Sequence, residues 1–287
     1  MPDIPDDTRS INPSSPVRPI ATDKAADKPE HGTALCLSGG GYRAMIFHAG
    51  VVWRLHETGV LKTLKRISSV SGGSITAGVL ALKWAKLTGA AVNRAAFENE
   101  FIAPLRELAS ETIDAESVVL GALLPGTVGD RIAKAYDKTL FHGATLQDLP
   151  DEPRFVINAT NVQSGALWRF MKPYMADYRV GIVDKPKISL ATAVTASSAF
   201  PPVLSPLVLS LDPESFKPNS GLDLQSKPYT SKVVLTDGGV YDNLGLETAW
   251  KRYDSVLVSD GGGKLEAEKE PKTDWARHSY RVLNLID

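Results

Sequence analysis

Two stretches near the start of the chain decide the fold: Thr33-Ala-Leu-Cys-Leu-Ser-Gly-Gly-Gly-Tyr-Arg43 and Ile67-Ser-Ser-Val-Ser-Gly-Gly-Ser-Ile-Thr76. The first begins with a short apolar run of the kind that forms a buried strand, the second begins with a short strand at residues 67–70, and each passes at once into a glycine-rich turn. Segments of helical composition follow at residues 44–55 and 75–87, and the second helix is expected to start on Ser74. The sequence therefore predicts two strand–turn–helix units in a row.

The two turns carry residue types that suit acyl transfer. A serine at the apex of a sharp strand-to-helix turn exposes its hydroxyl at the positive end of the helix. Glycines such as Gly72 and Gly73 permit the backbone torsions that such a turn needs. The glycine run at 39–41 can direct several N–H groups at one point, as an oxyanion site requires, and Arg43 adds a fixed positive charge beside it.

Three motifs in this order resemble the patatin-like phospholipases: Ser38-Gly-Gly-Gly-Tyr-Arg43, Ser71-Gly-Gly-Ser74 and Thr236-Asp-Gly-Gly239. That family comprises lipid acyl hydrolases related to the cytosolic phospholipases A. The segment Ala196-Ser-Ser-Ala-Phe-Pro-Pro202 also looks like the family's Ala-Ser-Ser-Ala segment. The resemblance spans residues 33–260 and implies an α/β fold of three layers, with a mainly parallel central sheet flanked by helices.

The resemblance also implies the site. The family uses a serine–aspartate dyad, so Ser74 would be the nucleophile and Asp237 its general base. The oxyanion hole would be formed by Gly39, Gly40, Gly41 and Arg43. The usual elbow reads Gly-x-Ser-x-Gly, and with Ser74 at its centre the last position holds Thr76, a departure that related cytosolic enzymes tolerate. Neither a metal nor another cofactor is required by this chemistry.

Other residues compete for these roles. A second Asp-Gly-Gly begins at Asp260, directly after an apolar run at 255–259, but family order and the adjoining residues 240–245 favour Asp237. Ser197 and Ser198 fall at a helix end and are interpreted as structural. The chain has five histidines, and a structural role is favoured for each because none lies in a segment typical of a base loop: His31, His48, His56, His142 and His278.

The remaining segments complete one domain. Strands are expected at 154–160 and 166–171, which form a hairpin, and at 203–211, 231–235 and 255–259; helices are expected at 188–198 and 243–252. Because sites in parallel α/β sheets form at the carboxyl ends of strands, Ser74 and Asp237 are expected to meet there. Residues 112–129 are either a lid over the site or a plain core helix that ends at Pro125.

The proline-rich residues 1–30 are predicted to be a mobile tail. Residues 31–287 are predicted to be the patatin-like catalytic domain, which either lacks a C-terminal portion or is completed by a last strand or helix at 282–286. The balance of 32 basic and 33 acidic residues argues against a general nucleic-acid binder. The single cysteine, Cys36, excludes an internal disulfide and is expected to be a buried structural thiol.

No apolar run reaches the roughly 18 residues of a membrane span, and the start of the chain lacks the apolar core of a secretory signal. We therefore expect a cytoplasmic protein, either free or attached peripherally to a membrane. Its expected function is hydrolysis of ester bonds in membrane phospholipids, of the phospholipase A type, through an acyl-enzyme. Two alternatives stay open: an effector lipase held inactive until a signal binds, as in bacterial antiphage defence, and a non-catalytic α/β protein that binds phosphate or nucleotide at its glycine turn.

Overall fold

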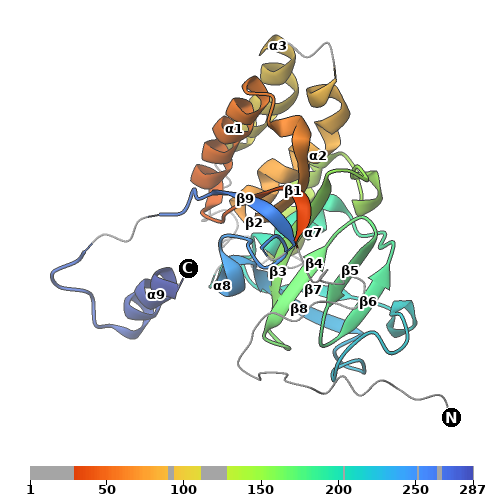
Figure 1. Cartoon of the computed structure of the whole chain (residues 1–287). Helices are drawn as coiled ribbons and strands as arrows, with labels where there is room; N and C mark the ends of the chain where they lie inside the picture. Colours follow the sequence, from red (N-terminus) through yellow and green to blue (C-terminus); the bar gives the residue numbers. More distant parts are fainter. Residues whose placement is uncertain are drawn as a thin grey trace.

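The computed structural model describes residues 29–89, 94–110, 128–202, 204–250, 252–263 and 267–286. The predicted tail at 1–30 and the segment at 112–129 lie outside these ranges except for their last two residues. The chain in the described ranges forms a central sheet with helices packed on it, and the last helix stands apart from the main body (Figure 1).

The described strands form one nine-stranded sheet with the order β6-β5-β4-β3-β2-β1-β9. β8 also pairs with β3, and β7 pairs with β8, so these two strands branch from the middle of the sheet. Parallel pairs join β9, β1, β2 and β3, whereas β4 to β8 add antiparallel pairs. The predicted α/β class is confirmed, and both glycine-rich turns belong to its parallel part. The strands are β1 (Glu30–Leu37), β2 (Leu64–Val70), β3 (Arg154–Asn161), β4 (Ala166–Phe170), β5 (Tyr174–Asp177), β6 (Gly181–Asp184), β7 (Leu207–Ser210), β8 (Lys232–Asp237) and β9 (Tyr253–Ser259).

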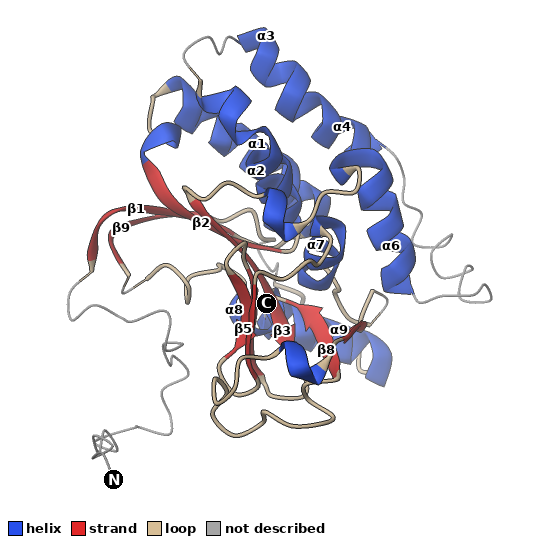
Figure 2. Cartoon of the chain, turned by 90° about the vertical axis from the view of Figure 1, so that its right-hand side faces the viewer, coloured by secondary structure: helices blue, strands red, loops and turns tan. Residues whose placement is uncertain are grey.

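Most helices cover one face of the sheet, and α8 lies on the other (Figure 2). α2 contacts β1, β2 and β3, and it is buried on nearly all sides from Gly72 to Ala81, so its sequence is apolar rather than amphipathic. α1 packs against α2 through a stripe of buried residues at helical spacing. The helices are α1 (Gly41–Glu57), α2 (Gly72–Thr88), α3 (Arg94–Phe97), α4 (Ala103–Ser110), α6 (Val128–Tyr136), α7 (Leu190–Ser197), α8 (Gly239–Asp242) and α9 (Trp275–Ile286).

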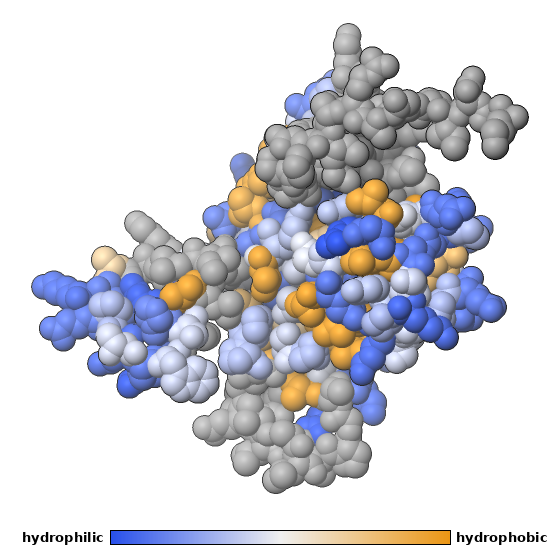
Figure 3. All heavy atoms as spheres, turned by 90° about the horizontal axis from the view of Figure 1, so that it is seen from below, coloured by the Kyte–Doolittle hydropathy of each residue, from blue (hydrophilic) through white to orange (hydrophobic). Residues whose placement is uncertain are grey.

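The main hydrophobic core lies between the sheet and this helix layer, and it includes fully buried Trp168 and Phe155. Cys36 is buried in β1, as predicted, and burial raises the pKa of its thiol to about 12. Seen from below, the main body shows hydrophobic patches among hydrophilic residues, whereas the described surface of the protruding α9 is mainly hydrophilic (Figure 3). Within the described ranges, none of the helices combines the length and apolar character needed to cross a bilayer.

Two predictions about local structure fail. The helix expected at 243–252 is absent from the described residues there, because α8 ends at Asp242 and Gly245 takes a left-handed φ of 66° that an α-helix does not accommodate. The helix expected to start on Ser74 starts earlier, at Gly72. The predicted hairpin is confirmed, since β3 and β4 pair antiparallel from Ile157↔Phe170 to Asn161↔Ala166.

Candidate active site

Ser71 is the residue at the apex of the second strand-to-helix turn. β2 ends at Val70 and α2 begins at Gly72, so one residue connects them. Ser71 has φ 49° and ψ −121°, a conformation that residues with a side chain rarely adopt. A serine held in such a strained bend between a strand and a helix is the signature of a nucleophile elbow.

Ser74 lies in the first turn of α2 rather than at the apex. Its N–H donates to the Ser71 carbonyl at 2.8 Å, as helical residues do. Its Oγ lies 3.0 Å from Ser69 Oγ and 2.9 Å from Ser197 Oγ, and the residue has no exposed surface. The prediction that Ser74 lies at the apex of the turn is therefore wrong.

The sequence contained a signal for Ser71. With Ser71 at the centre, residues 69–73 read Ser-Val-Ser-Gly-Gly, which departs from Gly-x-Ser-x-Gly only at the first position. Gly73 fills the place of the close-packing glycine, because a Cβ there would lie 2.5 Å from the Leu37 carbonyl oxygen. Thr76 lies outside this register, and its hydroxyl donates to the Met45 carbonyl at 2.9 Å across the α1–α2 contact.

The first glycine turn lies directly against this elbow. A Cβ on Gly72 would lie 2.0 Å from the Gly41 carbonyl oxygen, and a Cβ on Gly39 would lie 3.3 Å from Ser71 Cβ. Gly40 and Gly41 have φ values of 129° and 63°, which suit glycine. The structure thus places Gly39 and Gly41 against the elbow and Gly40 against the loop at 261–262, so the amides of the three predicted glycines are not equivalent.

The amide of Gly39 is already bound. It donates to the Asn243 carbonyl at 3.0 Å and to Asn243 Oδ1 at 3.1 Å. Asn243 thereby ties the segment after Asp237 to the glycine turn. This arrangement favours Gly40 and Gly41, rather than Gly39, as the donors of an oxyanion hole.

Arg43 and Asp260 lie on the outer side of the glycine turn. Arg43 is exposed in the first turn of α1, and a Cβ on Gly263 would lie 2.8 Å from its Nη2. Asp260 Oδ1 accepts from the Gly262 amide at 2.9 Å, while Ser38 Oγ accepts from the Gly261 amide at 2.8 Å. The second Asp-Gly-Gly therefore forms a loop that packs on the glycine turn.

Asp237 reaches the elbow through the register of the sheet. β2 pairs with β3 up to Val70↔Asn158, and β8 pairs with β3 up to Ala159↔Asp237. Because β4 occupies the other edge of β3, β2 and β8 run along the same edge and their last residues face consecutive positions of β3. The prediction that Asp237 follows a parallel strand is wrong, since β8 is antiparallel to β3, but the two chain ends still meet.

The Asp237 carboxylate lies in a buried setting. Asp237 is 2% exposed, and its Oδ1 accepts from the Gly239 amide at 2.8 Å. Burial is the main cause that raises the pKa of Tyr136 well above its usual value, followed by Tyr42, and the charge of Asp237 raises it further. Tyr136, which carried no sequence signal, is therefore an electrostatic neighbour of this carboxylate.

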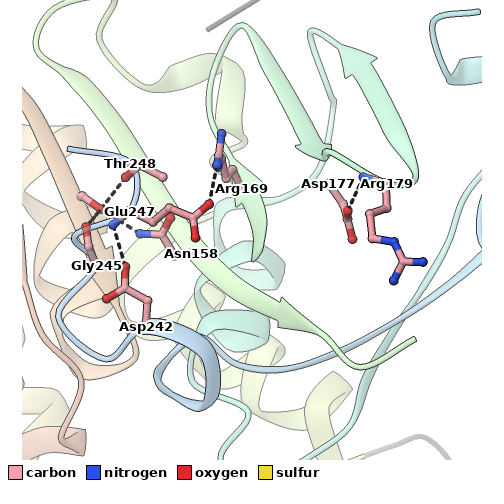
Figure 4. Close-up of polar contacts among 9 residues, drawn as sticks. Asn158, Arg169, Asp177, Arg179, Asp242, Gly245, Glu247 and Thr248 are labelled. Atoms are coloured by element: carbon pink, nitrogen blue, oxygen red, sulfur yellow. Dashed lines mark hydrogen bonds and ion pairs between the residues drawn. The ribbon is translucent and has the colours of Figure 1, made fainter. Parts of the chain in front are cut away.

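A polar network fixes the segment that follows Asp237 (Figure 4). Asn158 Nδ2 donates to Ser68 Oγ at 2.9 Å, and Ser68 Oγ donates to the Gly245 carbonyl at 2.6 Å. Arg169 and Glu247 form a buried ion pair of 2.8 Å, and burial raises the pKa of Glu247 although Arg169 opposes this. The network connects β2, β3 and β4 to residues 242–248.

His48 is a structural neighbour of the first turn. It is fully buried, with Nδ1 2.7 Å from Ser259 Oγ and Nε2 2.9 Å from the Ser38 carbonyl oxygen. Burial lowers the pKa of His48, so the ring is held neutral between the ends of β1 and β9. Among the described residues, no group of three or more histidine, cysteine or acidic side chains could hold a metal ion.

Comparison with known protein families decides the family. Residues 35–250 match the family model described as patatin-like phospholipase. The chain belongs to this family. The matched span contains both glycine-rich turns, α7 and the Asp237 motif, and of the residues of the site it leaves out only Ser259 and the loop at 260–263.

Solved structures give weaker likenesses to this patatin-like chain. Human GIVD cytosolic phospholipase A2 bound to methyl gamma-linolenyl fluorophosphonate and terbium chloride has 17% sequence identity and a TM-score of 0.49, over 79% of this chain and 40% of that one. VipD from Legionella pneumophila has 18% identity and a TM-score of 0.37, over 78% of this chain and 49% of VipD. The chain thus spans less than half the length of these structures. The comparison with curated proteins found no match.

Proposed function

We propose that the chain is a lipid acyl hydrolase of the phospholipase A type, with Ser71 as nucleophile and Asp237 as general base. The observation that carries this proposal is the strained serine elbow beside the carboxylate-bearing end of β8, both built on consecutive residues of β3. Membership of the patatin-like phospholipase family supports lipid hydrolysis in general. Ser71 replaces Ser74, because the Ser74 hydroxyl is fully buried and bound to Ser69 and Ser197.

The reaction begins when Ser71 Oγ attacks the carbonyl carbon of an ester and its proton passes to Asp237. The carbonyl oxygen becomes an oxyanion, which the amides of Gly40 and Gly41 stabilise, and such stabilisation is usually the largest contribution to rate. The tetrahedral species collapses to an acyl-enzyme, and the alcohol leaves with the proton from Asp237. A water molecule then gives a proton to Asp237 and attacks the acyl-enzyme, and Asp237 passes this proton to Ser71 Oγ as the acid leaves.

Two further features fit this reaction. Ser71 is the N-cap of α2, a helix of 17 residues, and the positive end of its dipole favours negative charge at this position. Arg43 is exposed at the rim of the glycine turn, where its charge suits a substrate that carries phosphate, and phospholipid at a membrane surface is the substrate we propose.

The experiment is a set of four single substitutions assayed on a p-nitrophenyl acyl ester. Ser71→Ala and Asp237→Asn should each abolish turnover. Asp260→Asn should keep most of it, since Asp260 only shapes the neighbouring loop. Ser74→Ala should stay active if it folds. Turnover retained by Ser71→Ala and lost in folded Ser74→Ala would return the nucleophile to Ser74.

A further inference from the structure

Ser197, the last residue of α7, bonds to Ser71 of the proposed dyad through its side chain and to Gly238, the residue after Asp237, through its main chain. It is fully buried, and its hydroxyl accepts a hydrogen bond of 2.9 Å from the main-chain N–H of Ser71. The same hydroxyl donates to the Asn158 carbonyl at 2.6 Å. Asn158 is the β3 residue that faces Val70, so Ser197 is anchored to the strand on which the elbow is built.

The main chain of the same segment holds Asp237. The Asp237 amide donates to the Ala199 carbonyl at 3.0 Å, and the next amide, that of Gly238, donates to the Ser197 carbonyl at 3.2 Å. Thr236 Oγ1 also donates to the Ala199 carbonyl at 3.0 Å. Three consecutive residues of β8 and its exit are therefore fixed to residues 197–199.

We infer that Ser197 is a positioning residue, which sets the placement of the Ser71 hydroxyl relative to Asp237; this inference rests on the proposed function. Sheet register alone brings β2 and β8 end to end, but it does not fix the direction in which the chain leaves β2. Ser71 leaves at φ 49°, and its main-chain N–H donates to Ser197 Oγ at 2.9 Å. Ser197 is the acceptor that this N–H finds, so the strained conformation is stabilised by a specific hydrogen bond.

This role differs from that of a hydroxyl that is merely buried in α7. Thr195 lies two residues earlier in the same helix and is 1% exposed, and its Oγ1 finds no hydrogen-bond partner among the described residues. Thr195→Val removes a buried hydroxyl from the same helix while it keeps the side-chain shape. It is the matched control for Ser197→Ala.

The test compares Ser197→Ala and Thr195→Val in the full chain by two kinetic measurements and by urea unfolding, which gives the fraction of folded protein. The kinetic measurements are kcat and KM on a p-nitrophenyl ester and the second-order rate constant for labelling by an alkyl fluorophosphonate, each normalised to folded protein. A displacement of about 1 Å in a reacting group can cost roughly 10²-fold in rate. Half of that loss on a logarithmic scale is about tenfold. We therefore expect Ser197→Ala to lower kcat and the labelling rate constant by at least about tenfold, while KM stays within about twofold of the wild-type value. Thr195→Val should match the wild type.

Two outcomes would overturn the inference. In the first, Ser197→Ala labels and turns over like the wild type. In the second, Ser197→Ala and Thr195→Val lose the same fraction of normalised activity, which would make the loss a general effect of removing a buried hydroxyl from α7. Failure of the wild type to be labelled at Ser71 would instead refute the proposed function, so the two failures are distinguishable.

Discussion

Gly72 is the point at which the elbow and the glycine turn are in closest contact, and Gly72→Ala should uncouple them. A Cβ at this position would lie 2.0 Å from the Gly41 carbonyl oxygen, whereas contacts below 3.0 Å essentially never occur. The Gly41 peptide must therefore move by at least the difference, 3.0 − 2.0 = 1.0 Å, or the elbow must move by the same amount. Either shift changes the distance between the Ser71 hydroxyl and the amides proposed to bind the oxyanion.

We expect Gly72→Ala to lower kcat about 10²-fold, the typical consequence of a displacement of about 1 Å. The strain should also lower the free energy of unfolding by about 1–3 kcal/mol, as for other overpacked sites. Gly50→Ala is the matched control, because Gly50 is exposed in α1 and a Cβ there meets nothing within 4 Å. It should leave kcat unchanged and raise the unfolding free energy by about 1 kcal/mol.

The assay is initial-rate esterase kinetics together with urea unfolding followed by tryptophan fluorescence. If Gly72→Ala had wild-type kcat, the glycine turn would not be part of the reaction site. If Gly72→Ala and Gly50→Ala lost activity equally, the loss would not come from the contact with Gly41.

Two further predictions concern the residues around the site. Glu247→Leu should lower the unfolding free energy by about 3–5 kcal/mol, because it removes the carboxylate that lies 2.8 Å from buried Arg169. Measured by urea unfolding, the double variant with Arg169→Met should regain most of this loss. If Glu247→Leu were as stable as the wild type, the ion pair would contribute nothing to stability. Because burial lowers the pKa of His48, the unfolded chain takes up a proton that the folded chain refuses. The stability that neutral His48 contributes is therefore present above pH 6.5 and is lost as the pH falls from 6.5 toward its folded value. His48→Gln should reduce the difference in melting temperature between pH 7.5 and 5.5, and an unchanged difference would refute this explanation.

Much of the fold follows from local sequence. β1 and β9 each contain a short apolar run just before a glycine-rich turn, and the β3–β4 hairpin turns at a Ser-Gly pair, so their physical causes lie within a few residues. The antiparallel placement of β8 has no such local cause. It depends on pairing with β3, about 75 residues earlier in the chain, and on hydrogen bonds to residues 197–199.

The site was predicted less completely than the fold. The motif made the region clear, but two serines three residues apart, Ser71 and Ser74, both fit a turn followed by a helix. Helix composition could not decide between them, because Gly72 and Gly73 are poor helix formers and made the helix start look later than it is. The glycines are required there by the close approach of Gly41 and Leu37, which is a property of the packed structure.

Asn243 and Tyr136 illustrate a different limit. Asparagine is a residue type that commonly caps helices, whereas Asn243 binds the Gly39 amide, about 200 positions away in the chain. Tyr136 lies in an amphipathic helix whose pattern indicates only burial. Neither role can be read from spacing, because each depends on which distant segments the sheet brings together.

The central claim is that Ser71 is the nucleophile, and covalent labelling tests it most directly. The wild-type chain would be treated with an alkyl fluorophosphonate, digested, and fragmented in the mass spectrometer so that Ser69, Ser71 and Ser74 are resolved. We predict a single adduct on Ser71 that is lost in Asp237→Asn and retained in Asp260→Asn. An adduct on Ser74, or no adduct on folded protein that hydrolyses esters, would contradict the account.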